Sequence, residues 1–328
     1  MRLDLARVLL ARTRIDRVFR DTPQYECEPL SAVLGCRVIL KVETLNPTRS
    51  FKGRGTETVL ARLQDSGNVN AVVCASAGNL GQALAYSGRL RGMPVTVVAS
   101  SAANPLKIER MKALGANVIL VDGEIELALA IAERYADETG AFLVEDSKDL
   151  GTCEGAATIG VELSELAGEL DSVLVALGAG AMATGVAFAL KSLREGVETI
   201  CVQPENAPAM TLALRAGKPV EVGRPSTIAD GVAGRYVIPE VLDDLAAVAD
   251  DAVLVTEGGI VEAMRLLYVH AGLVVEPAAA LGVASILESA GRFDGKTVAT
   301  ILCGSNVTPT DFDRWIQHGL AAPATGLP

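Results

Sequence analysis

One lysine in this chain of 328 residues stands in a setting that suits covalent chemistry. Lys52 lies in the segment NPTRSFKGRGTE, residues 46–57, between Phe51 and a glycine-rich basic turn. A lysine that forms an imine must be partly neutral, and burial or neighbouring cations favour the neutral amine. Because Arg49 and Arg54 flank Lys52, we expect their charges to favour that form. The ordinary alternative is a solvated lysine in a basic turn.

Three turns of small residues follow stretches that are typical of strands. They are ASAGNLGQA (75–83), LGAGAMATG (177–185) and CGSN (303–306). Ligands of open α/β sheets bind where strands end and helices begin, and free N–H groups at a helix start favour anions. The second turn therefore suits a phosphate and the first a carboxylate. Each is also consistent with a simple turn or a helix cap, with Ser76 or Asn79 as the capping residue.

The second turn also fits a competing dinucleotide site. Gly178-x-Gly180 is followed by Ala183, which one form of the Rossmann fingerprint permits, and the next strand supplies the acidic Glu205. A nicotinamide-dependent dehydrogenase therefore stays among the hypotheses, although this turn lies deep in the chain.

These turns must be positioned by an alternation of strands and helices. Short β-branched apolar runs, apolar on both sides, are typical of buried parallel strands. They are residues 37–43, 71–76, 95–100, 117–121, 172–177, 199–203 and 297–303, with helical patterns between them at 81–92, 105–115 and 125–140. The first 20 residues form an amphipathic helical pattern. This alternation predicts an open α/β fold.

Composition excludes several classes of function. A net charge of −11 argues against a nucleic-acid binder, and the apolar runs are too short to span a membrane, so we expect a cytoplasmic protein. The six cysteines form no Cys-x-x-Cys pair, which predicts reduced thiols. With two histidines, a His-rich metal site or a Ser-His-Asp triad has little material, so chemistry would be carried by an organic cofactor.

The motifs together resemble those of fold-type II pyridoxal-phosphate enzymes, most closely the threonine/serine dehydratase branch. SFKGRG, SAGN, GAGAM and CGSN occur in that family's order. Further matches are EGAATIGVEL (154–163), QPENAPAM (203–210), TIADGVA (227–233) and VVEPAAA (274–280). They run from Thr22-Pro23 to Asn306, which is most of the chain.

The resemblance implies two open parallel-sheet α/β domains with pyridoxal 5'-phosphate in the cleft between them. We assign residues 1–54 and 146–328 to a large cofactor domain and 55–145 to a small one. The chain ends soon after CGSN, so we expect no C-terminal regulatory domain. A homodimer acting on a small amino acid is the expectation from the family. Glu205 and Asp230 could contribute to a cation site, but we expect no metal.

The resemblance also implies roles for single residues. Lys52 would carry the cofactor as an imine, with Phe51 and Gly231 against opposite faces of the ring. Asn79 would bond the ring hydroxyl, and Cys303 would face the pyridine nitrogen, where the family usually has a serine. The phosphate would be held by backbone amides of Gly178, Ala179, Gly180, Ala181 and Met182. The substrate, through its α-carboxylate, would contact Ser76, Ala77, Gly78, Asn79 and Leu80, with Ser50 nearby.

These residue types favour one reaction. A thiol cannot keep the pyridine nitrogen protonated as a carboxylate would, which favours prompt β-elimination. Resembling racemases have a serine where this chain has Ala77, so racemisation is disfavoured. The prediction is a dehydratase in which Lys52 removes the α-proton and the cofactor phosphate protonates the departing hydroxyl. A β-replacement or threonine synthase and a non-catalytic binding protein are the alternatives within this fold.

Departures from the family pattern point to the substrate. Arg49 replaces the usual glycine, Leu80 replaces a frequent histidine, and Ala179 and Ala181 stand where glycines are common. We therefore expect threonine, serine or a bulkier β-hydroxy amino acid such as phenylserine, and we expect Arg49 to set this enzyme apart from its relatives.

Overall fold

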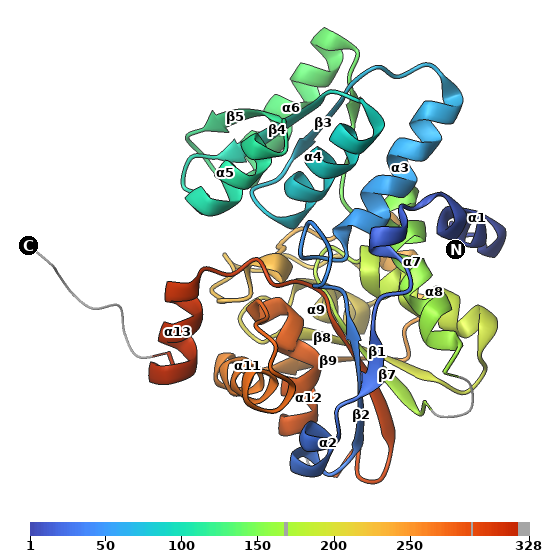
Figure 1. The fold of residues 1–328 in the computed structure, drawn as a ribbon, viewed down its shortest axis with the longest axis vertical. Coiled ribbons are helices and arrows are strands. Elements are labelled where there is room, and N and C mark those ends of the chain that lie inside the picture. Colours follow the sequence, from blue (N-terminus) through green and yellow to red (C-terminus); the bar gives the residue numbers. More distant parts are fainter. Residues whose placement is uncertain (167–169, 290, 321–328) are drawn as a thin grey trace, which may run out of the picture.

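The computed structural model describes residues 1–166, 170–289 and 291–320, which fold around two β-sheets. The larger sheet has the order β1-β2-β10-β7-β8-β9 and the smaller one β5-β4-β3-β6. All paired strands run parallel except β1, which lies antiparallel to β2 at the edge of the larger sheet. The structure is thus an α/β fold with two parallel-sheet domains, as the sequence predicts. Figure 1 shows the smaller sheet above the larger one.

The strands of the larger sheet are β1 (Gln24–Glu26), β2 (Arg37–Val42), β7 (Ser172–Ala176), β8 (Glu198–Pro204), β9 (Asp251–Val255) and β10 (Thr297–Leu302). Those of the smaller sheet are β3 (Val72–Ala75), β4 (Val95–Ser100), β5 (Asn117–Val121) and β6 (Phe142–Leu143). The seven predicted strands are all present. The sequence analysis did not single out β1 and β6, which are very short, or β9, whose side chains are partly exposed.

The helices are α1 (Leu5–Arg14), α2 (Glu28–Leu34), α3 (Lys52–Ser66), α4 (Asn79–Arg91), α5 (Pro105–Ala113), α6 (Ile125–Thr139), α7 (Leu150–Ser164), α8 (Ala181–Leu193), α9 (Ala209–Ala216), α10 (Pro239–Ala246), α11 (Glu257–Ala271), α12 (Leu281–Glu288) and α13 (Pro309–His318). Short 3₁₀ helices lie at Arg17–Phe19, Asp230–Val232 and Pro277–Ala280. The N-terminal pattern does not form one helix, because Ile15 is extended and Asp16 caps the 3₁₀ turn that follows.

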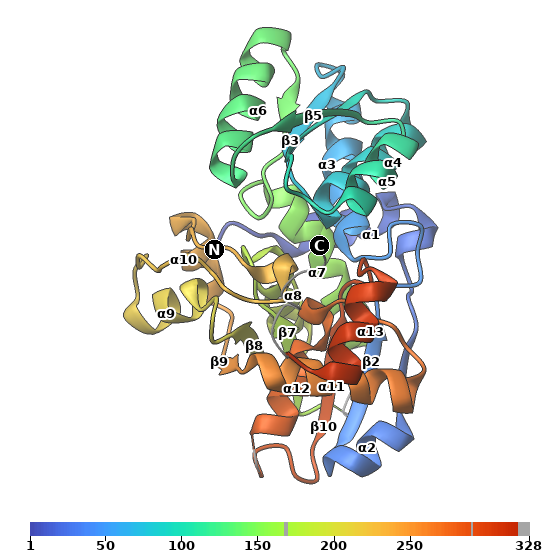
Figure 2. The same ribbon diagram turned by 90° about the vertical axis from the view of Figure 1, so that its left-hand side faces the viewer.

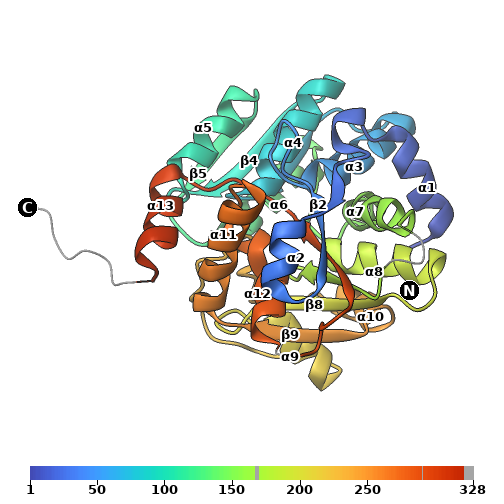
Figure 3. The same ribbon diagram turned by 60° about the horizontal axis from the view of Figure 1, so that its bottom comes forward.

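Both sheets are covered on two faces. In the smaller sheet, Val72 and Cys74 pack toward α4 and α5, whereas Val73 between them packs toward α6. In the larger sheet, α11 and α12 lie on one face and α7 and α8 on the other (Figure 3). Burial on both faces explains why the strand sequences are continuously apolar. In Figure 2, α6 of the smaller sheet stands above α10 on the same side of the molecule.

Helices α3, α7 and α8 pack with their backbones in direct contact through glycines. A Cβ atom added to Gly155 on α7 would overlap the carbonyl of Arg54 on α3, and one on Gly185 of α8 would overlap the carbonyl of Cys153. Because α3 begins at Lys52, it crosses the predicted boundary at residues 54 and 55. The domain limits therefore stay a prediction, and α3 is the element that the two units share.

A buried ion network fastens α3 to the larger sheet. The Arg54 guanidinium donates to Glu43 at 2.8 Å and to Glu162 of α7 at 2.6 Å. Lys41 of β2 also donates to Glu162, at 2.5 Å. Burial alone would raise the pKa of Glu162, but the hydrogen bonds and charge of Arg54, together with Lys41, hold it at about 2. The three chain segments are thus joined by charges that have no access to water.

Replacing Arg54 with methionine will destabilise the protein strongly, because two buried carboxylates lose their partner. Breaking a buried pair costs about 3–5 kcal/mol, whereas an exposed pair contributes about 0–1 kcal/mol. The matched control is Arg265→Met, which removes an exposed pair with Glu262. Urea denaturation measures both. Equal midpoints for the two variants would show that the network contributes nothing special.

Candidate active site

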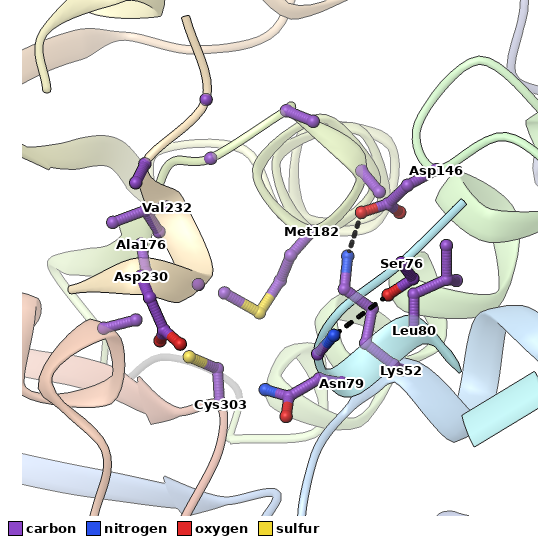
Figure 4. Close-up of a pocket in the computed structure, with 18 of the residues that line it drawn as sticks. Lys52, Ser76, Asn79, Leu80, Asp146, Ala176, Met182, Asp230, Val232 and Cys303 are labelled. Atoms are coloured by element: carbon purple, nitrogen blue, oxygen red, sulfur yellow. Dashed lines mark hydrogen bonds and ion pairs between the residues drawn. The ribbon is translucent and has the colours of Figure 1, made fainter. Parts of the chain in front are cut away.

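A cavity of about 430 Å³ lies between the two sheets, where helix starts and strand ends meet. Every predicted site residue except Ser50 lines it: Phe51, Lys52, Ser76, Ala77, Gly78, Asn79, Leu80, Gly178, Ala179, Gly180, Ala181, Met182, Gly231 and Cys303. These residues come from five separate segments of the chain, and Figure 4 shows several of them pointing into one space. The structure thus brings together the residues that the motifs singled out.

Lys52 stands at the first position of α3, and its amine faces the cavity. Its Nζ donates to Asp146 Oδ2 at 2.5 Å and lies 4.7 Å from the centre of the Phe51 ring. The turn is held in place because the Phe51 N–H donates to the carbonyl of Cys303 at 3.0 Å. The expectation that Arg54 acts on this amine is wrong, because its charge is compensated by Glu43 and Glu162.

The loop before α8 forms a cradle for an anion. Gly180 has a φ of +114°, and a Cβ atom there would lie 2.5 Å from Val241. Helix α8 begins at Ala181, so the first N–H groups have no acceptor within the helix. The Ala181 N–H already donates a hydrogen bond to the Ser147 hydroxyl at 2.9 Å. The neighbouring amides of this loop are the ones that a phosphate would engage.

The turn before α4 is a helix cap, as one of the sequence hypotheses held. Ser76 Oγ accepts from the N–H groups of Gly78 and Gly81, at 3.2 and 3.1 Å. Because a hydroxyl also carries a hydrogen, Ser76 keeps one donor for a ligand. Asn79 is fixed on both sides, since it donates to Glu276 at 2.7 Å and accepts from Asn306 at 2.8 Å. The second amide hydrogen of Asn79 remains for a cofactor.

Cys303 is buried at the cavity wall beside an acidic residue. Burial raises the pKa of its thiol, and the nearby Glu276 raises it further, so Cys303 stays protonated at neutral pH. Glu276 is itself buried, and burial together with the charge of Asp230 raises its pKa above the usual range. The cavity therefore offers a neutral thiol where the family pattern places the pyridine nitrogen.

Two predicted positions lie away from the cavity. Ser50 is fully buried and pairs through its backbone with Gly304, so it does not line the cavity as the sequence analysis expected. Arg49 is exposed, with a φ of +52°, and does not line the cavity either. Burial lowers the pKa of Arg110, and the positive charge of Arg49 lowers it further. The Arg110 guanidinium donates to Asn306.

Sequence reasoning assigned no role to Asp146, Glu276 and Lys107, three charged residues of this cavity. It considered Asp230, which pairs with Lys107 at 2.5 Å, only for a cation site. A signal for Asp146 exists, because it follows β6 at the end where parallel strands carry ligand-binding residues. Asp230 contacts Lys107 through its Oδ2 atom. Within the described part of the chain, no group of three acidic, histidine or cysteine side chains is arranged for a metal. In the same residues, no helix is long and apolar enough to cross a membrane.

The comparisons with known proteins agree with this geometry. The model of the family "Pyridoxal-phosphate dependent enzyme" matches residues 15–304. The chain belongs to that family. It is 36% identical to an L-threonine ammonia-lyase of Thermotoga maritima, over 89% of this chain and 72% of that protein. It is 32% identical to a phenylserine dehydratase of Ralstonia pickettii, over 96% of this chain and 97% of that protein.

The fold agrees with solved structures of the same family. The structure of maize serine racemase superposes on 95% of this chain and on 96% of the racemase chain, with a TM-score of 0.90 and 28% sequence identity. The chain is therefore a fold-type II enzyme of the threonine dehydratase and serine racemase family, and its cofactor is pyridoxal phosphate. The residues present fit that group, because a lysine amine, an anion cradle closed to Cβ atoms and a neutral thiol face one cavity.

Replacing Gly180 with alanine will weaken cofactor binding by tenfold or more, because the new methyl group needs the space of Val241. The matched control is Gly217→Ala, which has a similar left-handed φ of +64° but open space around it. Titration of both apo-proteins with pyridoxal phosphate, followed by absorbance, measures the effect. Unchanged affinity in the Gly180 variant would mean that the loop does not hold the phosphate.

Proposed function

We propose that this protein is a dehydratase that converts a β-hydroxy-α-amino acid into a 2-oxo acid and ammonia by β-elimination. The observation that carries the proposal is that the Lys52 amine and the buried neutral thiol of Cys303 line the same cavity. When bound, the cofactor would supply an electron sink next to the substrate α-carbon. A neutral thiol facing the ring nitrogen would keep that sink weak, which would favour rapid loss of the β-substituent.

The remaining roles follow from the cavity walls. Lys52 is proposed as the base that removes the α-proton. The turn from Ser76 to Leu80 is proposed to hold the substrate carboxylate through its amides and the Ser76 hydroxyl. Phe51 and Gly231 are proposed to lie against the two faces of the cofactor ring. The product leaves as an enamine, which tautomerises and hydrolyses in water to the 2-oxo acid.

A racemase is the second candidate, since maize serine racemase shares the fold closely. Racemisation needs an acid or base on the substrate face opposite Lys52. The turn that would supply it carries Ala77, whose methyl group cannot transfer a proton. This single residue favours elimination. The β-replacement and threonine synthases and a non-catalytic binding protein have no comparable observation in their favour.

The cavity extends toward a larger substrate. Ile125, Ala233 and Gly234 line it and also line an adjoining cavity of about 250 Å³. Gly234 has no side chain at this shared border, so we propose that a β-substituent larger than a methyl group can extend toward the adjoining cavity. This supports phenylserine beside threonine and serine as a substrate. By likeness to the family, we also propose a cytoplasmic homodimer.

Purified holoenzyme will release a 2-oxo acid from at least one of L-threonine, L-serine and phenylserine, and will form no detectable D-amino acid. Coupled assay of the oxo acid and chiral chromatography measure the two outcomes. Ala77→Ser will gain racemisation, because a hydroxyl then faces the side opposite Lys52. Inactivity on all three substrates would overturn the dehydratase proposal, and racemisation by the wild type would favour the second candidate.

A further inference from the structure

Asp146 has a firmly built position in the segment between β6 and α7. Its neighbour Ser147 is fully buried with a φ of +66° and accepts the Ala181 N–H from the cofactor loop. The Ser147 N–H donates to Thr152 at 3.0 Å, and Asp149 caps α7. On the other side of Asp146, the Val144 N–H donates to the Val73 carbonyl at 2.8 Å, so the backbone is held both before and after this residue. These backbone contacts fix the position of the Asp146 carboxylate.

The two carboxylate oxygens of Asp146 differ in their surroundings. Oδ2 accepts from Lys52 Nζ at 2.5 Å, as Figure 4 shows. Oδ1 is buried and has no hydrogen-bond partner within the described residues. A buried acceptor without a partner costs about 1–3 kcal/mol. The Asp146 carboxylate thus lies in the cavity beside the Lys52 amine, and its Oδ1 atom can still accept a hydrogen bond.

Of the ionisable groups near Asp146, Lys52 is the one placed to exchange a proton with it. Cys74 on β3 and Cys153 on α7 both feel its charge, but burial first of all raises the pKa of each thiol to about 12. Glu145 is paired with Lys148 at 2.8 Å, outside the cavity. Lys107 and Asp230, which also line the cavity, are paired with each other. Glu276, another carboxylate in the cavity lining, accepts from the Asn79 side chain and from the Asn306 N–H. Among the described residues of the lining, Lys52 and Asp146 are the ion pair left for a proton exchange.

A dehydration moves one proton between two places on the substrate. The Cα–H bond breaks and its electron pair forms the Cα=Cβ bond, while the Cβ–O electron pair leaves with the oxygen. A proton goes to the base, and a proton must reach the departing hydroxyl so that water leaves. No oxidant or reductant takes part. General acid catalysis of such a departure contributes about 10²–10⁴-fold.

We propose that Asp146 is the acid–base partner of Lys52. It receives from the Lys52 ammonium the proton taken from Cα, and its carboxylic acid then donates that proton to the departing β-hydroxyl. The carboxylate and the neutral amine are both restored when water leaves. This inference rests on the proposed dehydratase function, and it assigns to a side chain the proton delivery that the family resemblance assigns to the cofactor phosphate.

The test compares two leaving groups in Asp146→Asn holoenzyme. Elimination from the hydroxy amino acid that the wild type uses will fall about hundredfold or more. Elimination from β-chloroalanine will stay within a fewfold of wild type, because chloride leaves without a proton. The matched control is Glu145→Gln, which removes a charge from the same segment outside the cavity and will leave both rates unchanged.

A second readout needs no turnover. The Asp146 carboxylate holds the Lys52 amine in an ion pair, so apo Asp146→Asn will capture pyridoxal phosphate, followed by absorbance, faster than the wild type at one fixed pH. Equal loss of both substrates, or retention of both, would overturn the proposal, as would an unchanged rate of capture. A wild type inactive on every hydroxy amino acid but active on β-chloroalanine would instead overturn the dehydratase function.

Discussion

The site depends on the close packing of α3, α7 and α8, which only glycines permit. Gly155 and Gly185 bring the three backbones into contact, and the buried Arg54 network holds α3 against β2 and α7. Because each helix starts near the cavity, this packing places Lys52, the Asp146–Ser147 segment and the anion cradle around one space. The catalytic groups are thus fixed by contacts made one to two turns farther along their helices.

Charge is distributed so that one amine remains available. Arg54, two residues from Lys52, is compensated by Glu43 and Glu162, and among the described residues the lysine amine forms an ion pair with one carboxylate, Asp146. On the opposite wall Cys303 is neutral because burial disfavours its thiolate. The fold-type II framework is shared by the family, so a small number of cavity residues would decide which reaction this chain carries out. In this chain we propose that Ala77, Cys303 and Asp146 are those residues.

Local motifs predicted seven of the described strands, and every predicted site residue except Ser50 lines the cavity, because a small-residue turn after a buried strand has the same meaning in any open α/β sheet. The end of β6 points to Asp146 by the same rule, but the sequence does not show that Asp146 meets Lys52 or that Glu276 meets Asn79, since these partners come from distant segments. Ser50 shows the converse, because its motif neighbours line the cavity while its own backbone pairs with Gly304. Arg54 was misread for a similar reason. Its partners Glu43 and Glu162 lie in other elements, and sequence proximity to Lys52 suggested the wrong one.

The central claim is that Lys52 is the residue that carries the cofactor. Borohydride reduction of the holoenzyme, followed by proteolysis and mass spectrometry, tests it most directly, because reduction fixes the cofactor to the amine that holds it. The account predicts a pyridoxyl group on the peptide that contains SFKGRG, at Lys52. Labelling of another lysine, for example Lys107 on the opposite wall of the cavity, or no labelling at all, would contradict it.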